Sequence, residues 1–132
     1  MVICCDEKVP WERVLTLGDI PWSRNIYFDT PAHTRSNHQA AVRYRSKLKL
    51  LLGIAKRVTE SMGTDKVPAV ADTINHLSAM HATISAMIAG QIQDHETLDG
   101  GYACYNRRYM YASIYFATQN YDKILARIRE LT

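Results

Sequence analysis

Cysteine is scarce in the sequence, and long apolar runs are missing. The 132 residues include only three cysteines, Cys4, Cys5 and Cys104, which form neither a disulfide framework nor a paired metal motif. We expect reduced thiols in a cytoplasmic protein, because stable disulfides belong to oxidising compartments. No apolar run approaches the roughly 20 residues of a membrane span, and the first residues lack the basic and apolar regions of a secretory signal. We therefore predict no membrane partner.

Motifs that carry chemistry are also scarce. The sequence has no glycine-rich phosphate loop, no nucleophile elbow and no cysteine–histidine pair of useful spacing. His33 with His38, and His76 with His81, are five residues apart, and on a helix this spacing turns two side chains about 140° away from each other. Chelation by one helix needs a spacing of three or four, so we predict no metal site. His81, on an apolar stripe, is predicted to be a core histidine hydrogen-bonded to a serine or threonine.

The net charge is only +3, but the positive residues are unevenly placed. They cluster around one stretch of the chain, at Arg35, Arg43, Arg45, Lys47, Lys49, Lys56, Arg57 and Lys66. We expect no nucleic-acid partner, because aromatic residues are not interleaved with these charges as a base-stacking surface requires. A solvated helix face and a site for an anionic cofactor or neighbour both stay open as explanations.

Residues His38 to Met62 are predicted to form one long amphipathic helix. Their apolar residues repeat at steps of three and four, which places them on one face. These residues are Ala41, Tyr44, Leu48, Leu51, Leu52, Ala55, Val58 and Met62. Ser36 or Asn37 is the expected N-cap, and Gly63 is the expected left-handed C-cap. Such a helix cannot bury its apolar stripe alone, so it requires helical partners.

Two further helices are predicted downstream. The first runs from Asp65 to Gln93, with Asp65 as its cap and Pro68 in its first turn. Asp72 is its only formal charge after Val67, and a helix with so little polar surface is buried on more than one side. After a loop over Asp94–Gly101, the second runs from Tyr102 to Leu131. Its predicted apolar face comprises Ala112, Tyr115, Tyr121, Ile124, Leu125, Ile128 and Leu131.

The beginning of the chain has few helix signals. Val2 and Ile3 resemble the end of a strand, and Val9–Leu15 an extended segment, because the residue before Pro10 is forced into an extended conformation. No partner strand follows, so residues 1–15 are interpreted as the remnant of a preceding β-domain or linker, and residues 16–132 as a helical bundle domain. The predicted fold class is all-α, an up-and-down helical bundle with a short extended N-terminal segment.

One end of this bundle is expected to be covered by aromatic residues. A short helical turn is predicted near Asp19–Asn25, after which the chain continues as a loop. The residues expected to cover the end are Trp22, Ile26, Tyr27 and Phe28.

Three stretches carry a resemblance to a known family: Val9-Pro-Trp-Glu-Arg-Val-Leu15, Gln39-Ala-Ala-Val-Arg43 and the run that continues to Met62-Gly63. They resemble the 4-hydroxyphenylacetate 3-monooxygenase family, in its large oxygenase component, whose fold is related to that of acyl-CoA dehydrogenases. The similarity extends over nearly the whole chain and implies the family's C-terminal helical domain. The Pro-Trp-Glu-Arg motif resembles the passage from the middle β-domain into that helical domain.

The resemblance implies an activity for the parent enzyme. Members hydroxylate phenols with O2 and reduced FAD, which a separate flavin reductase delivers, and their helical domains build a tetramer. We therefore expect the helical part of such an enzyme, inactive alone and forming a homo-oligomer. Two alternatives stay open: a stand-alone helical module for oligomerisation or interaction, and a relative of 4-hydroxybutyryl-CoA dehydratase without its iron–sulfur ligands. The segment from His33 to Tyr44, where that relative carries a histidine and a cysteine, contains no cysteine.

Arg35, Gln39 and Arg43 are the predicted cofactor-binding residues. Their i, i+4, i+8 spacing forms one polar stripe away from the apolar face. The stripe lies at the predicted start of the helix, where free amide groups and the positive dipole end favour anions. The resemblance implies FAD as the anion, with Gln39 and Arg43 in a matched segment and Arg35 placed by spacing alone. No catalytic residue is predicted.

Leu50 and Gly53 lie opposite the main apolar stripe, which predicts self-association.

Overall fold

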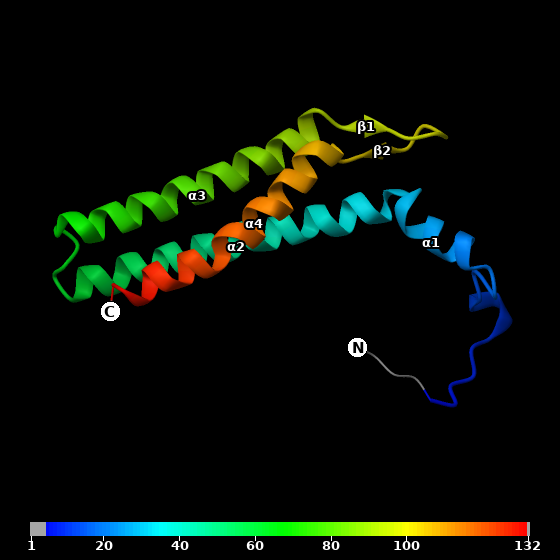
Figure 1. Ribbon diagram of the computed structural model, residues 1–132, viewed down its shortest axis with the longest axis horizontal. Helices are drawn as coiled ribbons and strands as arrows, with labels where there is room; N and C mark the ends of the chain where they lie inside the picture. Colours follow the sequence, from blue (N-terminus) through cyan, green and yellow to red (C-terminus); the bar gives the residue numbers. More distant parts are fainter. Residues whose placement is uncertain (1–4, 132) are drawn as a thin grey trace.

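The computed structural model describes residues 5–131 of the chain. Its main elements are three long helices, α2 (Pro31–Ser61), α3 (Pro68–Gln93) and α4 (Arg107–Arg129). Each contacts the other two, and they run up, down and up, so that the chain reverses at both ends of the bundle (Figure 1). The predicted all-α up-and-down bundle is therefore confirmed. The strand end predicted at residues 2 and 3 lies outside the described residues.

Helix α2 begins earlier than the sequence analysis predicts, because Thr30 caps it and Pro31 occupies its first position. The Thr30 hydroxyl accepts a hydrogen bond from an amide of the first turn. Proline at that position loses no hydrogen bond and has the φ angle that a helix needs. Ser36 and Asn37, predicted as the cap, lie inside the helix, where their side chains donate to the carbonyl of His33. The expected loop is thus helical.

The core lies along the inner faces of the three long helices. Its buried apolar residues are Ala41, Leu48, Ala55, Leu77, Ile84, Ile88 and Ile124. The stripe predicted for α2 is confirmed except at Met62, which is 53% exposed just beyond the helix. There Gly63 adopts a φ of 69°, the left-handed conformation predicted to end the helix.

Helix α3 begins at Pro68, and Asp65 does not cap it. The residue before the helix, Val67, is extended and no side chain caps the first turn, which agrees with the restriction that proline imposes on its predecessor. The helix packs on both α2 and α4, as its low charge predicts, and keeps an exposed outer face. Around the helix the hydroxyls of three residues donate to carbonyls of the same helix; they are Thr73, Ser78 and Thr83.

The loop predicted between the last two helices contains a small antiparallel hairpin. Strand β1 (Glu96–Thr97) pairs with β2 (Ala103–Cys104). The turn between them uses Gly100–Gly101 at φ values of 87° and 81°, which residues with a side chain rarely adopt. Because the chain forms this hairpin first, α4 begins at Arg107 and not at Tyr102 as predicted.

The buried face of α4 differs from the prediction in the first half of the helix. Met110 and Ser113 are buried there, whereas Ala112 and Tyr115 are exposed, Tyr115 by 69%. In the second half Ile124 is buried as predicted. The first half misled the analysis because apolar and aromatic residues occupy every side of it, so that periodicity alone does not select a face.

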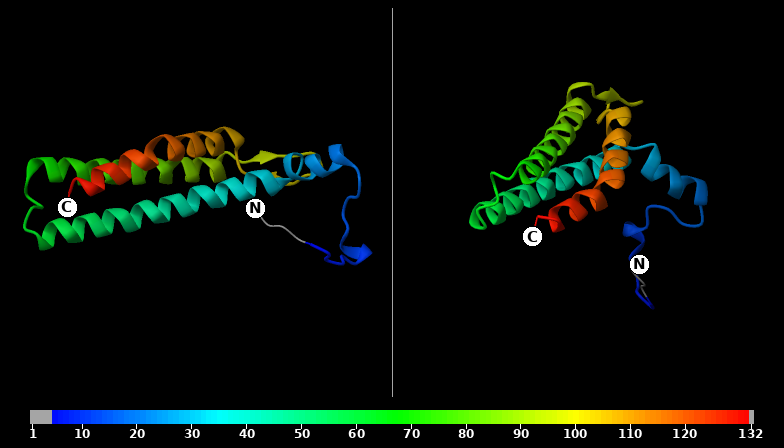
Figure 2. Two further views of the ribbon diagram at one scale, coloured as in Figure 1. Left: turned by 60° about the horizontal axis from the view of Figure 1, so that its bottom comes forward. Right: turned by 60° about the vertical axis from the view of Figure 1, so that its left-hand side comes forward.

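In the N-terminal part of the chain, residues 5–19 lie away from the three long helices, whereas the short helix that follows contacts α2 (Figures 1 and 2). A 3₁₀ turn, η1 (Trp11–Arg13), interrupts it, and α1 (Ile20–Phe28) is longer than the predicted turn. Asp19 caps α1 by accepting a hydrogen bond from the amide of Trp22 at 2.8 Å. The Trp22 side chain is 57% exposed, so it does not cover the bundle as predicted.

Candidate functional site

Polar and aromatic side chains gather at one end of the bundle, opposite the turn between α2 and α3. We call it the hairpin end (residues 26–38 and 91–113). There the start of α2, the end of α3, the hairpin and the start of α4 meet (Figure 1). A cleft of about 330 Å³ opens in this region. Its lining residues are Arg35, Ile92, His95, Ala103, Cys104 and Tyr105.

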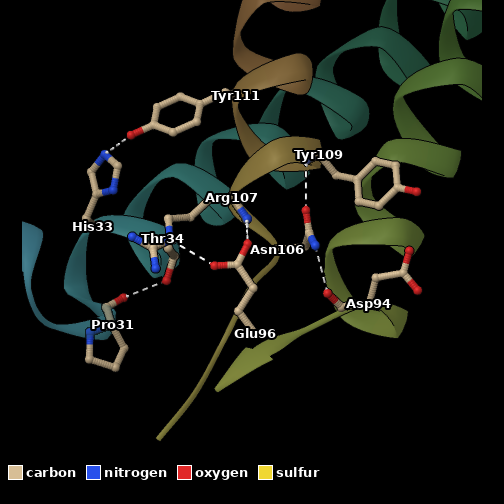
Figure 3. Close-up of polar contacts among 9 residues, drawn as sticks. All are labelled: Pro31, His33, Thr34, Asp94, Glu96, Asn106, Arg107, Tyr109 and Tyr111. Carbon is tan, nitrogen blue, oxygen red and sulfur yellow. Dashed lines mark hydrogen bonds and ion pairs between the residues drawn. The ribbon is translucent and has the colours of Figure 1, made fainter. Parts of the chain in front are cut away.

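His33 is the centre of an aromatic cluster at the hairpin end. It is 8% exposed, and its ring centroid lies 5.2 Å from that of Tyr27, 5.3 Å from that of Phe28 and 5.7 Å from that of Tyr111. The Tyr111 hydroxyl lies 3.5 Å from Nε2 of His33 (Figure 3). Tyr27 and Phe28 therefore contact this end, but they are 41% and 52% exposed and cover it only in part, whereas Ile26 is half-buried. The cluster joins α1, α2 and α4.

A second histidine, His38, begins a chain of hydrogen bonds that enters the core. Its Nδ1 lies 2.8 Å from Gln91 Oε1. Gln91 Nε2 donates to Ser113 Oγ at 3.1 Å, and Ser113 Oγ donates to the Met110 carbonyl at 2.7 Å. The His38 ring also stacks on Tyr105, with centroids 3.7 Å apart and planes 9° apart. Because buried polar groups need partners, this chain specifies how α2, α3 and α4 meet.

Glu96 attaches the hairpin to α4. Its Oε1 accepts from the backbone amide of Arg107 at 2.8 Å, and its Oε2 accepts from the Arg107 Nε at 2.9 Å (Figure 3). These two hydrogen bonds hold the pKa of Glu96 below its ordinary value, and the one from the backbone amide has the larger effect. The same carboxylate raises the pKa of Arg107. Asn106 caps α4 by accepting from the Tyr109 amide, and it donates to the Asp94 carbonyl, so a further bond joins the start of α4 to the end of α3.

The three predicted cofactor-binding residues are all exposed on α2. Because the helix begins at Pro31, Arg35 lies in its second turn, and Gln39 and Arg43 lie further along. The helix dipole and the free amides act within the first turn, so the physical reason for placing an anion at these residues is wrong. Only Arg35 lines the cleft. Within residues 5–131 no ion pair engages Arg35 or Arg43.

The sequence analysis did not predict Gln91 or Tyr105 as site residues, although both make specific contacts at the hairpin end. Gln91, 0% exposed, is a polar residue on an apolar helix, and this contrast could have marked it. Tyr105 is positioned by a hairpin that was not predicted. His81, predicted as a core histidine, is only half-buried. The serine bond near it runs from Ser85 Oγ to its backbone carbonyl and not to its ring, so that prediction is wrong.

Two further features of the described part of the chain concern metal ions and membranes. Residues 5–131 contain no group of three or more histidine, cysteine, aspartate or glutamate side chains that could hold a metal ion. Cys104 is a buried free thiol in the cleft, without such a group around it. None of the described helices combines the length and apolarity needed to cross a membrane.

Comparison with known proteins places the bundle in a family. Residues 23–132 match the family model described as 4-hydroxyphenylacetate 3-hydroxylase C terminal. The 4-hydroxyphenylacetate 3-monooxygenase oxygenase component of Thermus thermophilus is 35% identical over 86 residues, or 62% of this chain. The 2,4,6-trichlorophenol monooxygenase of Cupriavidus pinatubonensis is 28% identical over 93 residues, or 63% of this chain. Each alignment covers 18% of the relative, so the chain spans only a small part of the length of these curated relatives.

Solved structures agree with this match in fold. The oxygenase component (HpaB) of 4-hydroxyphenylacetate 3-monooxygenase superposes with a TM-score of 0.83 at 25% identity, over 93% of this chain and 25% of that chain. A structure of this component complexed with FAD and 4-hydroxyphenylacetate gives a TM-score of 0.80 at 26% identity, with the same coverage. The resemblance found in the sequence is thereby confirmed. The chain belongs to the 4-hydroxyphenylacetate 3-hydroxylase family and corresponds to its C-terminal helical domain.

Proposed function

We propose that the chain provides the helical domain of an aromatic hydroxylase that uses reduced FAD and O2 to hydroxylate a phenol. The observation that carries this proposal is the superposition of 93% of the chain on an oxygenase structure complexed with FAD and 4-hydroxyphenylacetate. We propose residues 16–132 as this domain and residues 1–15 as the remnant of a preceding β-domain or linker. A separate flavin reductase delivers the reduced FAD in the cytoplasm, in line with a relative described as an FADH(2)-dependent monooxygenase.

Arg35, Gln39 and Arg43 are the proposed contacts of the cofactor. Reduced FAD supplies the electrons that activate O2 in such an enzyme, and the protein binds and orients the cofactor. The three side chains are exposed on one side of α2, and neither arginine is engaged in an ion pair within the described chain. A guanidinium group can bind a phosphate through two parallel hydrogen bonds. The residues therefore fit the diphosphate of FAD without any contribution from the helix dipole.

The chain also contributes a surface for assembly. Leu50 and Ile54 are 63% and 50% exposed on α2, on either side of Gly53. With Lys49 and Arg57 they line a shallow groove of about 580 Å³. An exposed apolar strip on a helix favours packing against another helix, so we assign the homo-oligomer contact to this strip, with a tetramer as the assembly that the family resemblance implies. A stand-alone oligomerisation module is the second candidate function, carried by the same strip.

The isolated chain is expected to be inactive. Flavin-dependent hydroxylation needs a pocket that excludes water, and the chain corresponds to 25% of the oxygenase chain on which it superposes. Incubation with reduced FAD, O2 and 4-hydroxyphenylacetate should give no catechol product above the background of free flavin. Product above that background would contradict this expectation.

A domain exchange tests the proposed function in a complete enzyme. Residues 23–132 replace the matching C-terminal domain of the Thermus thermophilus oxygenase component, and binding of reduced FAD is measured by anaerobic titration beside a thermal melt. A chimera that binds FAD and hydroxylates 4-hydroxyphenylacetate supports the proposal. A chimera that folds and assembles yet binds no FAD overturns it.

The variant Arg43→Ala in this chimera tests the cofactor contact. A charge-assisted contact of this kind contributes roughly 1.5–3 kcal/mol, so the affinity for FAD should fall by about 10- to 100-fold. The melting temperature without flavin should not change, because the side chain is exposed. Arg127→Ala, at an exposed arginine in the last turn of α4, is the matched control and should leave the affinity unchanged. An unchanged affinity, or a large loss of stability without flavin, would show that Arg43 is not a cofactor contact.

A further inference from the structure

A polar pocket lies between α2 and α3, near the middle of both helices, and we call it the seam pocket. Its volume is about 340 Å³. Its lining residues are Arg45, Ser46, Lys49, His81 and Ser85. Every one of these side chains is polar, although both helices also contribute apolar residues to the core. The seam pocket therefore has a purpose that packing of the bundle does not explain.

The antiparallel arrangement of α2 and α3 brings these residues to the same level. Two of them are four positions apart on α2 and two are four positions apart on α3, so each pair lies on one face of its helix. The hydrogen bond that joins His38 to α3 fixes the register of the helices. Counted from this bond, Arg45 and Ser85 each lie about two turns away, and Lys49 and His81 each lie about three turns away.

The groups of the seam pocket that can donate to a ligand are all unengaged. Within residues 5–131, Arg45 and Lys49 form no ion pair, and the ring of His81 makes no hydrogen bond. The two hydroxyls differ, because Ser46 and Ser85 donate their single hydrogens to carbonyls of their own helices, at 3.0 and 2.7 Å. The donors left for a ligand are therefore a guanidinium, an ammonium and an imidazole.

The charge of the seam pocket is positive and uncompensated. Arg45 and Lys49 carry like charges at a spacing that destabilises a helix. No carboxylate lines the pocket, and Glu60, the next acid along α2, pairs with Lys56 instead. An anion bound in the pocket would relieve this repulsion.

The number and placement of the donors favour a phosphate group over a carboxylate. A carboxylate offers two oxygens, whereas a phosphate group offers three and carries a charge of about −1.5 to −2 at pH 7. The guanidinium can bind two of these oxygens in parallel, and the ammonium adds a second positive charge. The imidazole approaches from the other helix and can donate to the third oxygen.

We propose that the seam pocket binds a phosphate group, held by Arg45 and Lys49 from α2 and by His81 from α3. Inorganic phosphate and a phosphomonoester share this group. Arg45 follows Arg43 by two positions, which turns it about 200° around the helix. The site thus lies on another side of α2 than the proposed contacts of FAD, and it does not rest on them.

NMR of the histidine rings in the intact chain tests the site directly. Inorganic phosphate is titrated at fixed pH and constant ionic strength, so that general screening does not change. The ring resonances of His81 should move and reach saturation. Those of His76, which lies on the same helix but outside the pocket, should stay unchanged. A His81 ring that phosphate does not move, or equal shifts of both rings, would overturn the proposal.

Two variants assign the binding to the basic residues. Lys49→Gln, at an exposed position, removes a charge-assisted contact and should weaken phosphate binding by about 10-fold. Arg45→Gln should do the same and is an independent test if one variant does not fold. Lys123→Gln, at an exposed position of α4, is the matched control and should leave the affinity unchanged. Unchanged affinity in both pocket variants, or an equal loss in the control, would overturn the site.

A titration with glycerol phosphate distinguishes the two sources of the phosphate group. Tighter binding than that of inorganic phosphate would support the site and assign it to a phosphomonoester. Equal or weaker binding would support the site and assign it to free phosphate. If neither compound moves the His81 ring, the proposal is wrong.

Discussion

Removal of the Glu96 carboxylate should loosen the hairpin from α4. In Glu96→Ala, two hydrogen bonds to Arg107 disappear, one to the backbone amide at 2.8 Å and one to the guanidinium at 2.9 Å. An anionic acceptor at the first amides of a helix contributes about 1 kcal/mol. The ion pair joins side chains that are 48% and 32% exposed, so screening by solvent reduces its contribution to about 0.5 kcal/mol. We expect the free energy of unfolding to fall by about 1.5 kcal/mol in total.

Two further variants separate these contributions. The oxygen of Glu96→Gln still accepts from the amide but has no charge, so we expect a loss of about 0.5–1 kcal/mol. Glu60→Ala is the control, because Glu60 pairs with Lys56 at 3.9 Å across one exposed helix turn and should lose only about 0.3 kcal/mol. Urea unfolding followed by circular dichroism gives the three free energies. A loss in Glu96→Ala no larger than that in Glu60→Ala would refute the reasoning.

The pH dependence of stability gives an independent check on Glu96. Hydrogen bonds from Arg107 hold the pKa of this carboxyl below its ordinary value of 4.5 in the folded state. The resulting stabilisation is present above the ordinary value and is lost as the pH falls through the lowered folded pKa. Glu96→Gln should lack this part of the acid destabilisation. Equal acid sensitivity in the wild type and in Glu96→Gln would count against the assignment.

Three further outcomes are expected. Burial raises the pKa of Tyr44 above its ordinary value of 10.0, and its hydroxyl is a buried atom without a hydrogen-bond partner in the described chain. The free energy of unfolding should therefore fall as the pH rises from 10.0 through the raised pKa of the folded state. Tyr44→Phe should remove this alkaline loss and raise the free energy of unfolding by about 1 kcal/mol in urea unfolding. An alkaline stability profile that the variant leaves unchanged would contradict this. Ile84→Ala, at a core position that is 0% exposed, should lower the free energy of unfolding by roughly 2–5 kcal/mol, and a much smaller loss would show that the site is not tightly packed. Glutamate at both Leu50 and Ile54 should convert a homo-oligomer into a monomer in light scattering, whereas a wild-type monomer at micromolar concentration would argue against assembly through this strip.

The helices could be predicted from the sequence because each long helix repeats its apolar residues over many turns. The apolar stripe from Ala41 to Val58 could be predicted from the local spacing of its residues alone. In the structure these side chains are buried or half-buried. The first residue of each helix was harder to predict. For α2, both Thr30–Pro31 and Ser36–Asn37 are sequences typical of a helix start, and only the contacts of the folded chain decide between them. The hairpin strands have two residues each, which is too short for an alternating pattern to appear.

The candidate site could not be derived in the same way because its residues come together from distant parts of the chain. His38 and Gln91 are 53 positions apart, and nothing in the spacing of either helix indicates that they meet. The cleft depends on Tyr105, which follows a hairpin that the sequence did not reveal. The stripe of Arg35, Gln39 and Arg43 was accessible to prediction because it lies on one helix, but its place relative to the helix start was not.

The outer face of α3 changes in character along the helix. The exposed residues Asp72, Asn75, Ala79, Ala82 and Ala86 are spaced so that they lie on one side of it. Ser78 and Thr83, which flank this side, donate their only hydrogen to carbonyls of the same helix, so they can offer water an acceptor but no donor. Water is therefore bound mainly at Asp72 and Asn75, near the start of the helix. The part from Ala79 to Ala86 can be covered by another protein surface with a smaller desolvation penalty.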